Sequence, residues 1–460
     1  MGVQLPATEH AVIVFSFCMA WCSVSTAAYM DVFVFAKTRK DYVTATEEFG
    51  MEPSMRAAVY SAFYLGWLFG DPLFGWIADK WGRHPSVYGA VALGFVFQAS
   101  CALAIGQYSL FVLRFLAGMC IGGADLVAYV HCIELCTTEQ RANSGAVMQV
   151  FFASGLCLSA AIAVVFPNWR QMYLAASVPL LFFLSTYFIV PESPRWLQQQ
   201  IRSGKFKGSE RISKADSAEH LGQHRSLLHI SDAQQKERGI NPQLDEEGLE
   251  SLKKADNHEE FTYSQLLNDS GTSTTLLIAC VIWMTSGFLY YGITLSAGSI
   301  SDELHLNMFL MGIVEIPAYI VTPYLADNIG RKHSFMLFNV LAAFFCLVSW
   351  VYPRKQGRLL FALCGKICGS AVFSLCWIWA PEIFPTRARS LTTAIGSQAA
   401  RVGSIVAPYV VVLMSEMSTG TIGPDGKPES PLPQPVFAVA AMSSLLFAYY
   451  LPETKDLDMI

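Results

Sequence analysis

The segment GWIADKWGRH, residues 75–84, decides how the rest of the chain is interpreted, because it separates two apolar stretches and is partly repeated. Its DKWGR at 79–83 is matched by DNIGR at 327–331, which lies 248 residues later. The same spacing relates a second set of charges, the pair Glu134 and Arg141 and the pair Glu382 and Arg389. Internal duplication of membrane-length units is typical of secondary transporters.

Outward from this segment, hydropathy over a window of about 19 residues predicts twelve membrane spans. They are expected near residues 10–35, 56–78, 85–105, 108–131, 142–166, 170–190, 273–297, 304–326, 333–352, 357–380, 390–415 and 434–452. Each can cross a hydrocarbon core of about 30 Å as a helix, which satisfies its own backbone hydrogen bonds in lipid. The predicted fold class is an all-α membrane protein, with twelve transmembrane helices in two pseudo-symmetric six-helix bundles.

The composition points the same way, because only 15% of the 460 residues are charged and 53% are hydrophobic. These values exclude a disordered chain or a coiled coil and disfavour a soluble enzyme. The net charge of -5 gives no general attraction to nucleic acid. We find no phosphate-binding GxxxxGK[ST] loop, no nucleophile constellation and no CxxC pair, so we expect no catalysis, no cofactor and no metal site.

A polar, charged segment divides the predicted spans into six and six. We therefore expect an N-terminal bundle at 1–197, a linker at 198–270 and a C-terminal bundle at 271–460. The linker is either a solvated tether or a regulatory element. Lysine and arginine are nearly balanced across the remaining loops, so the orientation rests on the linker, which as a charged block resists translocation. We expect the linker and both termini to be cytoplasmic.

Further motifs indicate a family. They are PESPRWL at 191–197, YYG at 290–292, VEIPAY at 314–319, PEIFPTRARS at 381–390 and QAARVGSIVAPY at 398–409. Together with the repeated segment, they resemble the organic cation, organic anion and carnitine transporter family of solute carriers, within the major facilitator superfamily. The resemblance runs from about residue 56 to 455. PESPRWL is shared with sugar porters, but the QQxSG pattern of the sugar porters is missing from the seventh span.

The resemblance implies a multi-pass protein of the plasma membrane that works by alternating access. The chain departs from the family after the first span, where only about 20 residues stand in place of a long, cysteine-bearing, glycosylated loop. The sequon Asn268-Asp269-Ser270 falls on the expected inner side. This departure puts glycosylation and loop-mediated oligomerisation in doubt but leaves the translocation core untouched.

The repeated segment carries charges that can form breakable contacts. A tight turn needs Gly82 and Gly330, and a carboxylate at the end of the preceding helix can pair with the arginine that follows. Such ion pairs either lock and release the cytoplasmic ends of the bundles or serve as static anchors. The gating candidates are Asp79, Arg83, Glu134, Arg141, Asp327, Arg331, Glu382 and Arg389.

Arg401 is the first candidate for substrate binding, because ionisable groups inside a span are costly and mark sites by default. Twelve residues from the inner end of its span place it about 18 Å deep, near the midplane. Its planar fork matches a carboxylate. The resemblance implies anionic or carnitine-like substrates, because that branch has arginine here whereas the cation branch tends to have an acid. The alternative is a structural ion pair with Glu315.

Three further charges and a tyrosine complete the polar set. Glu315 and Lys366 match charges common in the family and either bind substrate or pair with each other or Arg401. Tyr319 replaces a lysine of the anion branch. Asp125 departs from most relatives. The charges of Arg401, Lys366, Glu315 and Asp125 cancel, which favours a zwitterion over a dianion.

Aromatic residues should complete the site. Tyr290, Tyr291 and Phe373 match positions that line the cavity in the family, and their faces can hold a quaternary ammonium group. For Trp377 and Trp379 we expect packing rather than a place in the site.

The sequence therefore predicts a secondary transporter that moves small organic ions across a lipid bilayer, with anions or carnitine-like zwitterions favoured. The alternatives are an organic cation carrier, a sugar porter and a non-transporting receptor or scaffold that acts through the linker. The coupling ion and the oligomeric state are left open.

Overall fold

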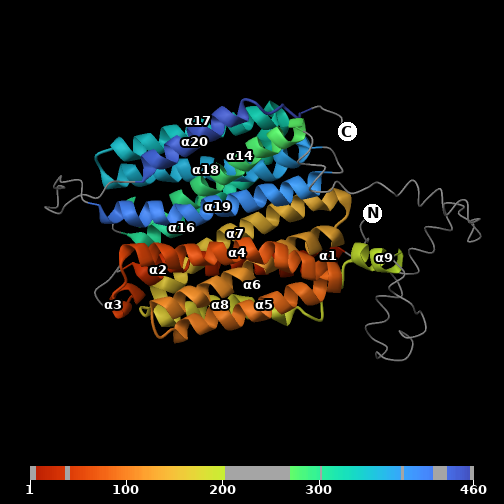
Figure 1. Cartoon of the computed structure of the whole chain (residues 1–460), viewed down its shortest axis with the longest axis horizontal. Helices are drawn as coiled ribbons and strands as arrows, with labels where there is room; N and C mark the ends of the chain where they lie inside the picture. Colours follow the sequence, from red (N-terminus) through yellow and green to blue (C-terminus); the bar gives the residue numbers. More distant parts are fainter. Residues whose placement is uncertain are drawn as a thin grey trace, which may run out of the picture.

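The computed structural model describes residues 7–36, 42–202, 270–300, 303–384, 388–417 and 433–455 (Figure 1). Most of the predicted linker lies outside these ranges. The described residues form helices and no strand; an isolated bridge joins Val43 to Asn168. The helices of the first half are α1 Ala7–Tyr29, α2 Asp31–Phe35, α3 Ala45–Phe49, α4 Pro53–Trp81, α5 Arg83–Ser100, η1 Cys101–Leu103, α6 Gln107–Leu135, α7 Thr138–Val165, α8 Trp169–Ser185 and α9 Pro194–Arg202.

The second half repeats this order of long helices. Its helices are α14 Ser270–Leu295, α15 Ala297–Ile300, α16 Leu304–Ile329, α17 Arg331–Val351, α18 Lys355–Ile383, α19 Arg389–Glu416 and α20 Gln434–Ala448. Each of the twelve predicted spans is therefore occupied by a helix. Within the described ranges, nine are long and apolar enough to cross a membrane by composition alone, and α4, α8 and α20 supply the remaining three. The predicted fold class is confirmed.

Glycines let helices approach closely inside each half. In the first half α4 packs along α6, and a Cβ on Gly118 would lie 2.0 Å from the carbonyl oxygen of Phe63. In the second half α14 packs along α19, and a Cβ on Gly403 would lie 2.0 Å from the carbonyl oxygen of Met284. Small residues at such contacts allow the backbones to approach, which is how helices associate in lipid.

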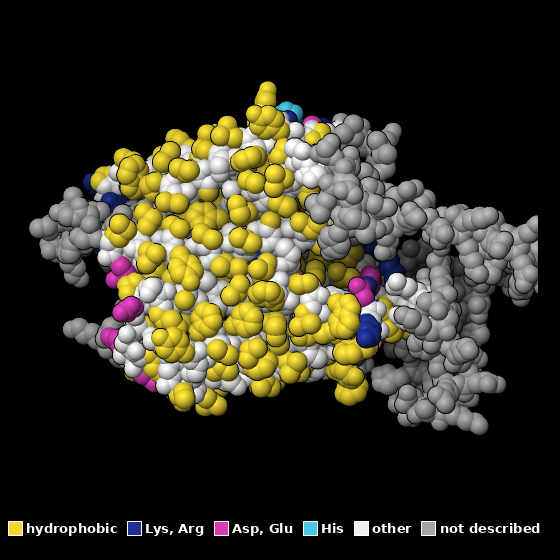
Figure 2. All heavy atoms as spheres, viewed as in Figure 1, with side chains coloured by type: hydrophobic (Ala, Val, Ile, Leu, Met, Phe, Trp, Pro, Cys, Tyr) yellow, Lys and Arg dark blue, Asp and Glu magenta, His cyan; other side chains and the backbone are white. Residues whose placement is uncertain are grey.

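The two halves lie side by side, with the first half in red to yellow and the second in green to blue (Figure 1). They meet where α4 packs on α19 and where α7 packs on α16. Figure 2 shows hydrophobic side chains over the middle of the visible face, with acidic and basic side chains toward its two ends. This distribution is that of a protein whose middle faces hydrocarbon and whose ends face water.

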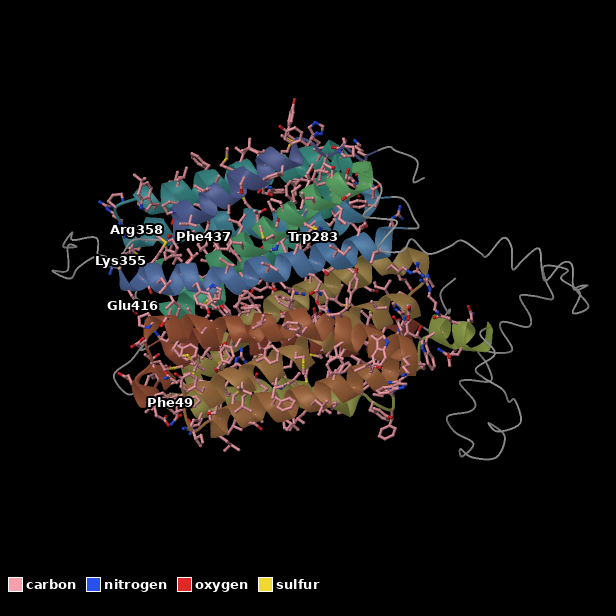
Figure 3. All side chains as sticks on the ribbon, viewed as in Figure 1. Phe49, Trp283, Lys355, Arg358, Glu416 and Phe437 are labelled. Carbon is pink, nitrogen blue, oxygen red and sulfur yellow. The ribbon has the colours of Figure 1, made fainter. Side chains whose placement is uncertain are left out.

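The two ends of the molecule can be told apart by labelled residues. Phe49, Lys355, Arg358 and Glu416 lie at the end opposite α9 (Figure 3). α9 begins directly after the PES motif, and Glu192 of that motif accepts a hydrogen bond from the backbone N–H of Arg83, so the first copy of the repeated segment lies at the α9 end. We call the Glu416 end the outer end and the α9 end the inner end, following the orientation predicted from the linker.

Candidate functional site

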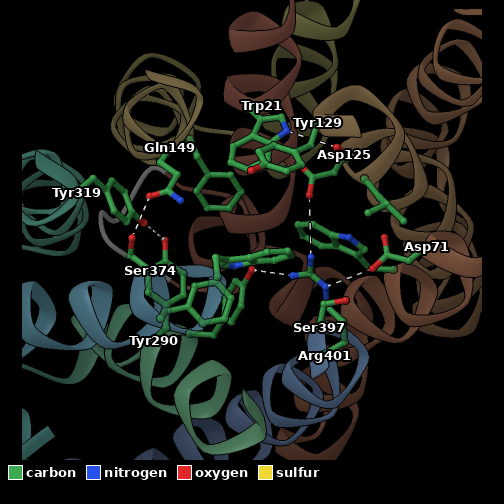
Figure 4. Close-up of a pocket in the computed structure, with 16 residues that line it drawn as sticks. Trp21, Asp71, Asp125, Tyr129, Gln149, Tyr290, Tyr319, Ser374, Ser397 and Arg401 are labelled. Atoms are coloured by element: carbon green, nitrogen blue, oxygen red, sulfur yellow. Dashed lines mark hydrogen bonds and ion pairs between the residues drawn. The ribbon is translucent and has the colours of Figure 1, made fainter. Parts of the chain in front are cut away.

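A cavity lies between the two halves and contains the residues on which the function depends (Figure 4). It has about 800 Å³ of space free of atoms, part of which is open to solvent. Helices of both halves contribute to its wall. The lining residues are Trp21, Trp67, Asp71, Asp125, Leu126, Tyr129, Gln149, Phe152, Tyr290, Tyr291, Tyr319, Phe373, Ser374, Trp377, Ser397 and Arg401.

Arg401, on α19, is the central charge of this cavity, and its side chain is 7% exposed. Its Nε lies 3.7 Å from Asp71 Oδ2 and its Nη2 lies 4.0 Å from Asp125 Oδ2. Its Nη1 donates a hydrogen bond of 3.2 Å to the hydroxyl of Tyr291. The guanidinium also stacks over the ring of Trp67, with its carbon 3.8 Å from the ring centroid. Arg401 is thus paired with the first half and not with Glu315, the partner considered from the sequence.

Asp71, on α4, is a charged residue of the site that the sequence reasoning missed. Its Oδ2 accepts a hydrogen bond of 3.1 Å from Gln398 Nε2 in addition to the contact with Arg401. The signal was present, because Asp71 is an ionisable residue inside the predicted span 56–78 and such residues mark sites by default. Including Asp71 changes the balance of charges at the midplane from zero to one excess negative charge.

Lys366 and Glu315 form a separate ion pair behind the cavity wall. Lys366 Nζ lies 2.6 Å from Glu315 Oε1, and both side chains are fully buried. The hydroxyls of Tyr290 and Tyr319 donate to Glu315 Oε2 over 2.8 and 2.9 Å. The ammonium group also sits 3.5 Å from the centroid of the Tyr290 ring. Of these four sequence candidates, the two tyrosines line the cavity, and the two charges lie behind them and pair with each other.

Aromatic side chains form much of the remaining wall. The rings of Tyr290 and Phe373 stack with centroids 5.1 Å apart, and the Tyr291 ring meets that of Tyr64 at 4.9 Å. Trp377 lines the cavity, whereas packing was expected for it, and its ring also meets that of Trp283 edge to face with centroids 4.9 Å apart. The first half contributes aromatic rings that the sequence reasoning did not select: Trp21, Trp67, Tyr129 and Phe152.

Trp379 takes the packing role expected for it. It is 1% exposed, and its Nε1 donates a hydrogen bond of 3.1 Å to the carbonyl oxygen of Pro452. Trp377 and Trp379 differ by two positions on α18, so a helix directs them to different faces. The sequence alone did not tell which of the two faces the cavity.

The repeated segment forms the predicted tight turns at the inner end. Gly82 and Gly330 have φ angles of 113° and 108°, which a residue with a Cβ adopts only with strain. A Cβ at these positions would also lie 2.3 and 2.4 Å from a carboxylate oxygen of Glu192 and Glu453, respectively. The turns therefore need glycine both for the backbone angle and for the space.

The charges of the first copy hold helices of the first half together. Arg83 lies 2.5 Å from Asp79 Oδ1 and 3.4 Å from Glu134 Oε2. Ser193 Oγ donates to the same oxygen of Glu134 over 2.5 Å. Glu192 accepts hydrogen bonds from backbone N–H groups of α5, beginning with Arg83 at 3.0 Å, and burial raises the pKa of this carboxyl.

The second copy repeats this arrangement. Arg331 lies 3.0 Å from both Asp327 Oδ1 and Glu382 Oε2, and Thr454 Oγ1 donates to Glu382 over 2.6 Å. Glu453 accepts from the backbone N–H of Arg331 at 2.9 Å. In this conformation the ion pairs of both copies join helices within one half, rather than one bundle to the other.

The last two gating candidates lie at helix starts of the inner end. Arg141 is in the first turn of α7, where its Nε donates to the carbonyl oxygen of Ile133 over 3.3 Å. Arg389 is the first residue of α19.

At the outer end, contacts join the two halves. Arg56 of α4 forms an ion pair with Glu416 of α19. The ring of Phe33 stacks on that of His305 with centroids 5.3 Å apart, and Ser61 Oγ donates to the carbonyl oxygen of Ile405 over 2.7 Å. On the side toward α9, Figure 2 shows a hollow between the halves. The cavity is therefore closed toward the outer end and is approached from the inner end.

Comparison with known proteins agrees with this architecture. Residues 11–460 match the family described as sugar (and other) transporter. Organic cation/carnitine transporter 4 of Arabidopsis thaliana is 29% identical over 404 residues, which cover 86% of this chain and 71% of the relative. The organic cation transporter protein of Drosophila melanogaster is 28% identical, with 87% of this chain and 69% of the relative covered. Solute carrier family 22 member 15-like of Xenopus laevis is 27% identical, with 86% and 75% covered.

Among solved structures, the xylose transporter XylE from E. coli, in a partially occluded inward open conformation, superimposes with a TM-score of 0.71. The match covers 98% of this chain and 100% of that chain at 16% sequence identity. At this identity the likeness concerns the fold alone. The resemblance to organic cation, organic anion and carnitine transporters, inferred from motifs, is confirmed by the relatives.

Proposed function

We propose that this chain, which belongs to the sugar (and other) transporter family of the major facilitator superfamily, carries a small organic cation or a carnitine-like zwitterion. That the chain is a multi-pass membrane protein and a secondary transporter follows from its family and relatives. The class of substrate goes beyond the family, and we infer it from the cavity. It rests on one observation, the position of Arg401 between Asp71 and Asp125 in a cavity walled by aromatic rings.

The charges of the cavity support a substrate that carries a positive group. Arg401 faces two carboxylates, so a purely anionic guest would meet an excess of negative charge. Aromatic faces attract a quaternary ammonium group by about 0.5–2 kcal/mol each, depending on desolvation. A zwitterion can place its ammonium group among the rings near Asp125 and its carboxylate beside Arg401, in exchange for one of the present contacts of the guanidinium. The sequence favoured anions or carnitine-like zwitterions; of these, the anions have less support here, because the charge sum from the sequence did not include Asp71.

We propose the same roles for the inner charges, the same division of the chain and the same orientation that the sequence predicts. The eight charges of the repeated motifs act as inner gating contacts: six of them form ion pairs within each half here, and these pairs change partners when the halves rock. The chain is divided at 1–197, 198–270 and 271–460. The linker and both termini face the cytoplasm of a cell whose plasma membrane holds the protein.

The test is uptake by the purified full chain in proteoliposomes. Four radiolabelled compounds are compared under a clamped membrane potential: carnitine, tetraethylammonium, a urate-sized anion and glucose. We expect saturable uptake of carnitine or tetraethylammonium, or both, and little uptake of the other two. Uptake of the anion alone would overturn the charge argument, and uptake of glucose alone would make the chain a sugar porter.

Deleting residues 205–260 distinguishes a carrier from a receptor or scaffold that acts through the linker. A carrier should retain at least slow uptake without them, because its cavity and inter-half contacts lie elsewhere. Loss of all uptake, with the melting temperature of the purified variant unchanged, would show that the linker takes part in the function.

A further inference from the structure

The two carboxylates beside Arg401 each have one oxygen, Oδ1, without a hydrogen-bond partner among the described residues, but they differ in what holds the other oxygen. Asp71 Oδ2 is held from α19 by both Gln398 and Arg401. Among the described residues, the carboxylate of Asp125 has one polar contact, 4.0 Å from its Oδ2 to Arg401 Nη2, and its Oδ1 has no hydrogen-bond partner. Asp125 is nevertheless 8% exposed and lines the cavity (Figure 4). It is a buried carboxyl with an unused oxygen at a site that a ligand can reach.

A buried carboxylate raises the free energy of the protein unless its negative charge is compensated. A buried charge without a partner is relieved either by a bound proton or by a cation from the ligand. Two features favour the ligand's cation as an alternative to the proton. First, Asp125 lines the cavity. Second, the rings of Trp21 and Tyr129 lie beside Asp125, and Trp21 Nε1 donates a hydrogen bond of 3.4 Å to the backbone carbonyl oxygen of Asp125.

The other side chains that line the cavity do not fully compensate the charge of Asp125, so the bound proton or the cation of the ligand is still needed. Arg401 from α19 and Asp71 from α4 are the charged side chains that share the cavity with it, and Tyr291 from α14 is committed to Arg401. From α1 and α7 the cavity receives Trp21, Gln149 and Phe152, which do not titrate. No described residue of α5 or α9 lines the cavity. Arg401 contacts both carboxylates, and Asp71 accepts a further hydrogen bond from Gln398, so Asp125 is the less compensated of the two.

Resting on the proposed function, we infer that Asp125 binds either a proton or the ammonium group of the substrate, and never both. The carrier then exchanges an organic cation for a proton. When the cation arrives, the O–H bond of Asp125 breaks and its proton leaves to the solvent in the cavity. When the cation departs, the carboxylate takes up a proton again. For a monovalent cation the exchange is electrically neutral.

Competition for one carboxylate has a defined signature. Because only the ionised carboxyl binds the cation, the apparent Kd rises as pH falls, by at most about tenfold per pH unit for one proton. By linkage, binding of the cation must release protons to the same extent. Tetraethylammonium is a suitable probe, since its charge does not depend on pH, so any pH effect belongs to the protein.

The first experiment measures tetraethylammonium uptake by the full chain in proteoliposomes with equal potassium on both sides and valinomycin present. A lumen made one pH unit more acidic than the outside should drive uptake transiently above equilibrium, and a protonophore should abolish that excess. The Asp125→Asn variant should show no response to the pH gradient. Glu52→Gln, which makes the same chemical change at an exposed carboxyl before α4, should behave like the native chain.

The second experiment does not depend on transport. Tetraethylammonium is added to the detergent-solubilised chain in weakly buffered solution, and the released protons are counted with a pH dye. The native chain and the Glu52→Gln variant should release protons, whereas Asp125→Asn should release none. Asp125→Glu should restore release, and its melting temperature reports whether the cavity still folds.

The outcomes separate this inference from the function on which it rests. Tetraethylammonium or carnitine uptake that ignores the pH gradient, with no protons released on binding, overturns the exchange and leaves the transport proposal standing. Proton release that persists in Asp125→Asn overturns the assignment to Asp125. Absence of binding and uptake of both compounds at every pH overturns both proposals.

Discussion

Arg401 Nε on α19 lies 3.7 Å from Asp71 Oδ2 on α4, so an ion contact crosses the boundary between the two halves at the level of the cavity. Both side chains are nearly buried, at 7% and 5% exposed. Breaking a buried pair by removing one partner costs about 3–5 kcal/mol, because a charge is left uncompensated. Any rocking of the halves must therefore either preserve this contact or offer the separated charges water or a ligand.

Arg401→Ala should change selectivity more than it changes transport as such. A hydrogen bond to a charged group contributes about 1.5–3 kcal/mol, so we expect carnitine uptake to fall by about 10- to 100-fold relative to tetraethylammonium uptake. The uptake ratio of Arg401→Lys should lie between those of the native chain and Arg401→Ala, since lysine keeps the charge but loses the planar fork. The measurement is the ratio of the two uptake rates in proteoliposomes.

Tyr291→Phe serves as the control for Arg401, because it removes the hydrogen bond of 3.2 Å and leaves both carboxylate contacts. It should change the ratio by less than Arg401→Ala does. If Arg401→Ala alone does not fold, Asp71→Asn in the same chain removes one of the two uncompensated acids. Equal losses for both substrates in the double variant would assign Arg401 a structural role.

The ion pair between Arg56 and Glu416 should help to close the outer end. Its side chains are 18% and 47% exposed, so its contribution should be at most about 1 kcal/mol. We expect Arg56→Glu to raise the accessibility of the cavity from the outside, and the swapped double variant with Glu416→Arg to reverse the effect. A double-mutant cycle on melting temperature and uptake from outside measures the coupling. Additive effects of the two changes would rule out a functional pair.

Gly118→Ala should destabilise the first half. The added Cβ would lie 2.0 Å from the carbonyl oxygen of Phe63, so α4 and α6 must separate, at a cost of about 1–3 kcal/mol or more. Gly89→Ala on α5 is the matched control, since nothing lies within 4 Å of the Cβ position there. That change should be neutral or stabilising by up to about 1 kcal/mol, from helix propensity. Melting temperatures in one detergent compare the two, and equal shifts would refute the packing argument.

Glu453→Gln should lower stability at neutral pH. Burial alone would raise the pKa of this carboxyl, but hydrogen bonds from the backbone N–H groups of Lys455 and Arg331 hold it below its ordinary 4.5. A lowered pKa means that the ionised carboxylate stabilises the fold above pH 4.5 and that this contribution is lost as pH falls below that value. Losing a charged acceptor should cost about 1–3 kcal/mol.

The check for Glu453 is a series of melting temperatures in detergent between pH 7 and pH 4. The difference between the native chain and Glu453→Gln should be largest at pH 7 and should shrink below pH 4.5, the ordinary value for this carboxyl. Glu303→Gln, at an exposed carboxyl whose side chain caps no helix, should show little difference at any pH. A constant difference for Glu453→Gln across the series would contradict the titration argument.

The sequence found most of the second-half side of the site but little of the first-half side. Arg401, Tyr290, Tyr291, Tyr319 and Phe373 were predicted, and all five line the cavity. Family motifs supplied these positions, because they lie in recognisable stretches of the second half. The first-half wall has no such motif, and an aromatic residue in an apolar helix gives no sign in the sequence of whether it faces lipid, a neighbouring helix or a cavity.

What the sequence by itself determined is the architecture. The length and apolarity of each span, the repeat at 248 residues and the glycines of the two inner turns are local properties, and in lipid a long apolar run can satisfy its backbone only as a helix. What only the tertiary structure decided is the pairing of charges. Arg401 meets Asp71, 330 positions earlier in the chain, and not Glu315, because the relative rotation of packed helices, and not spacing along the chain, brings side chains into one cavity.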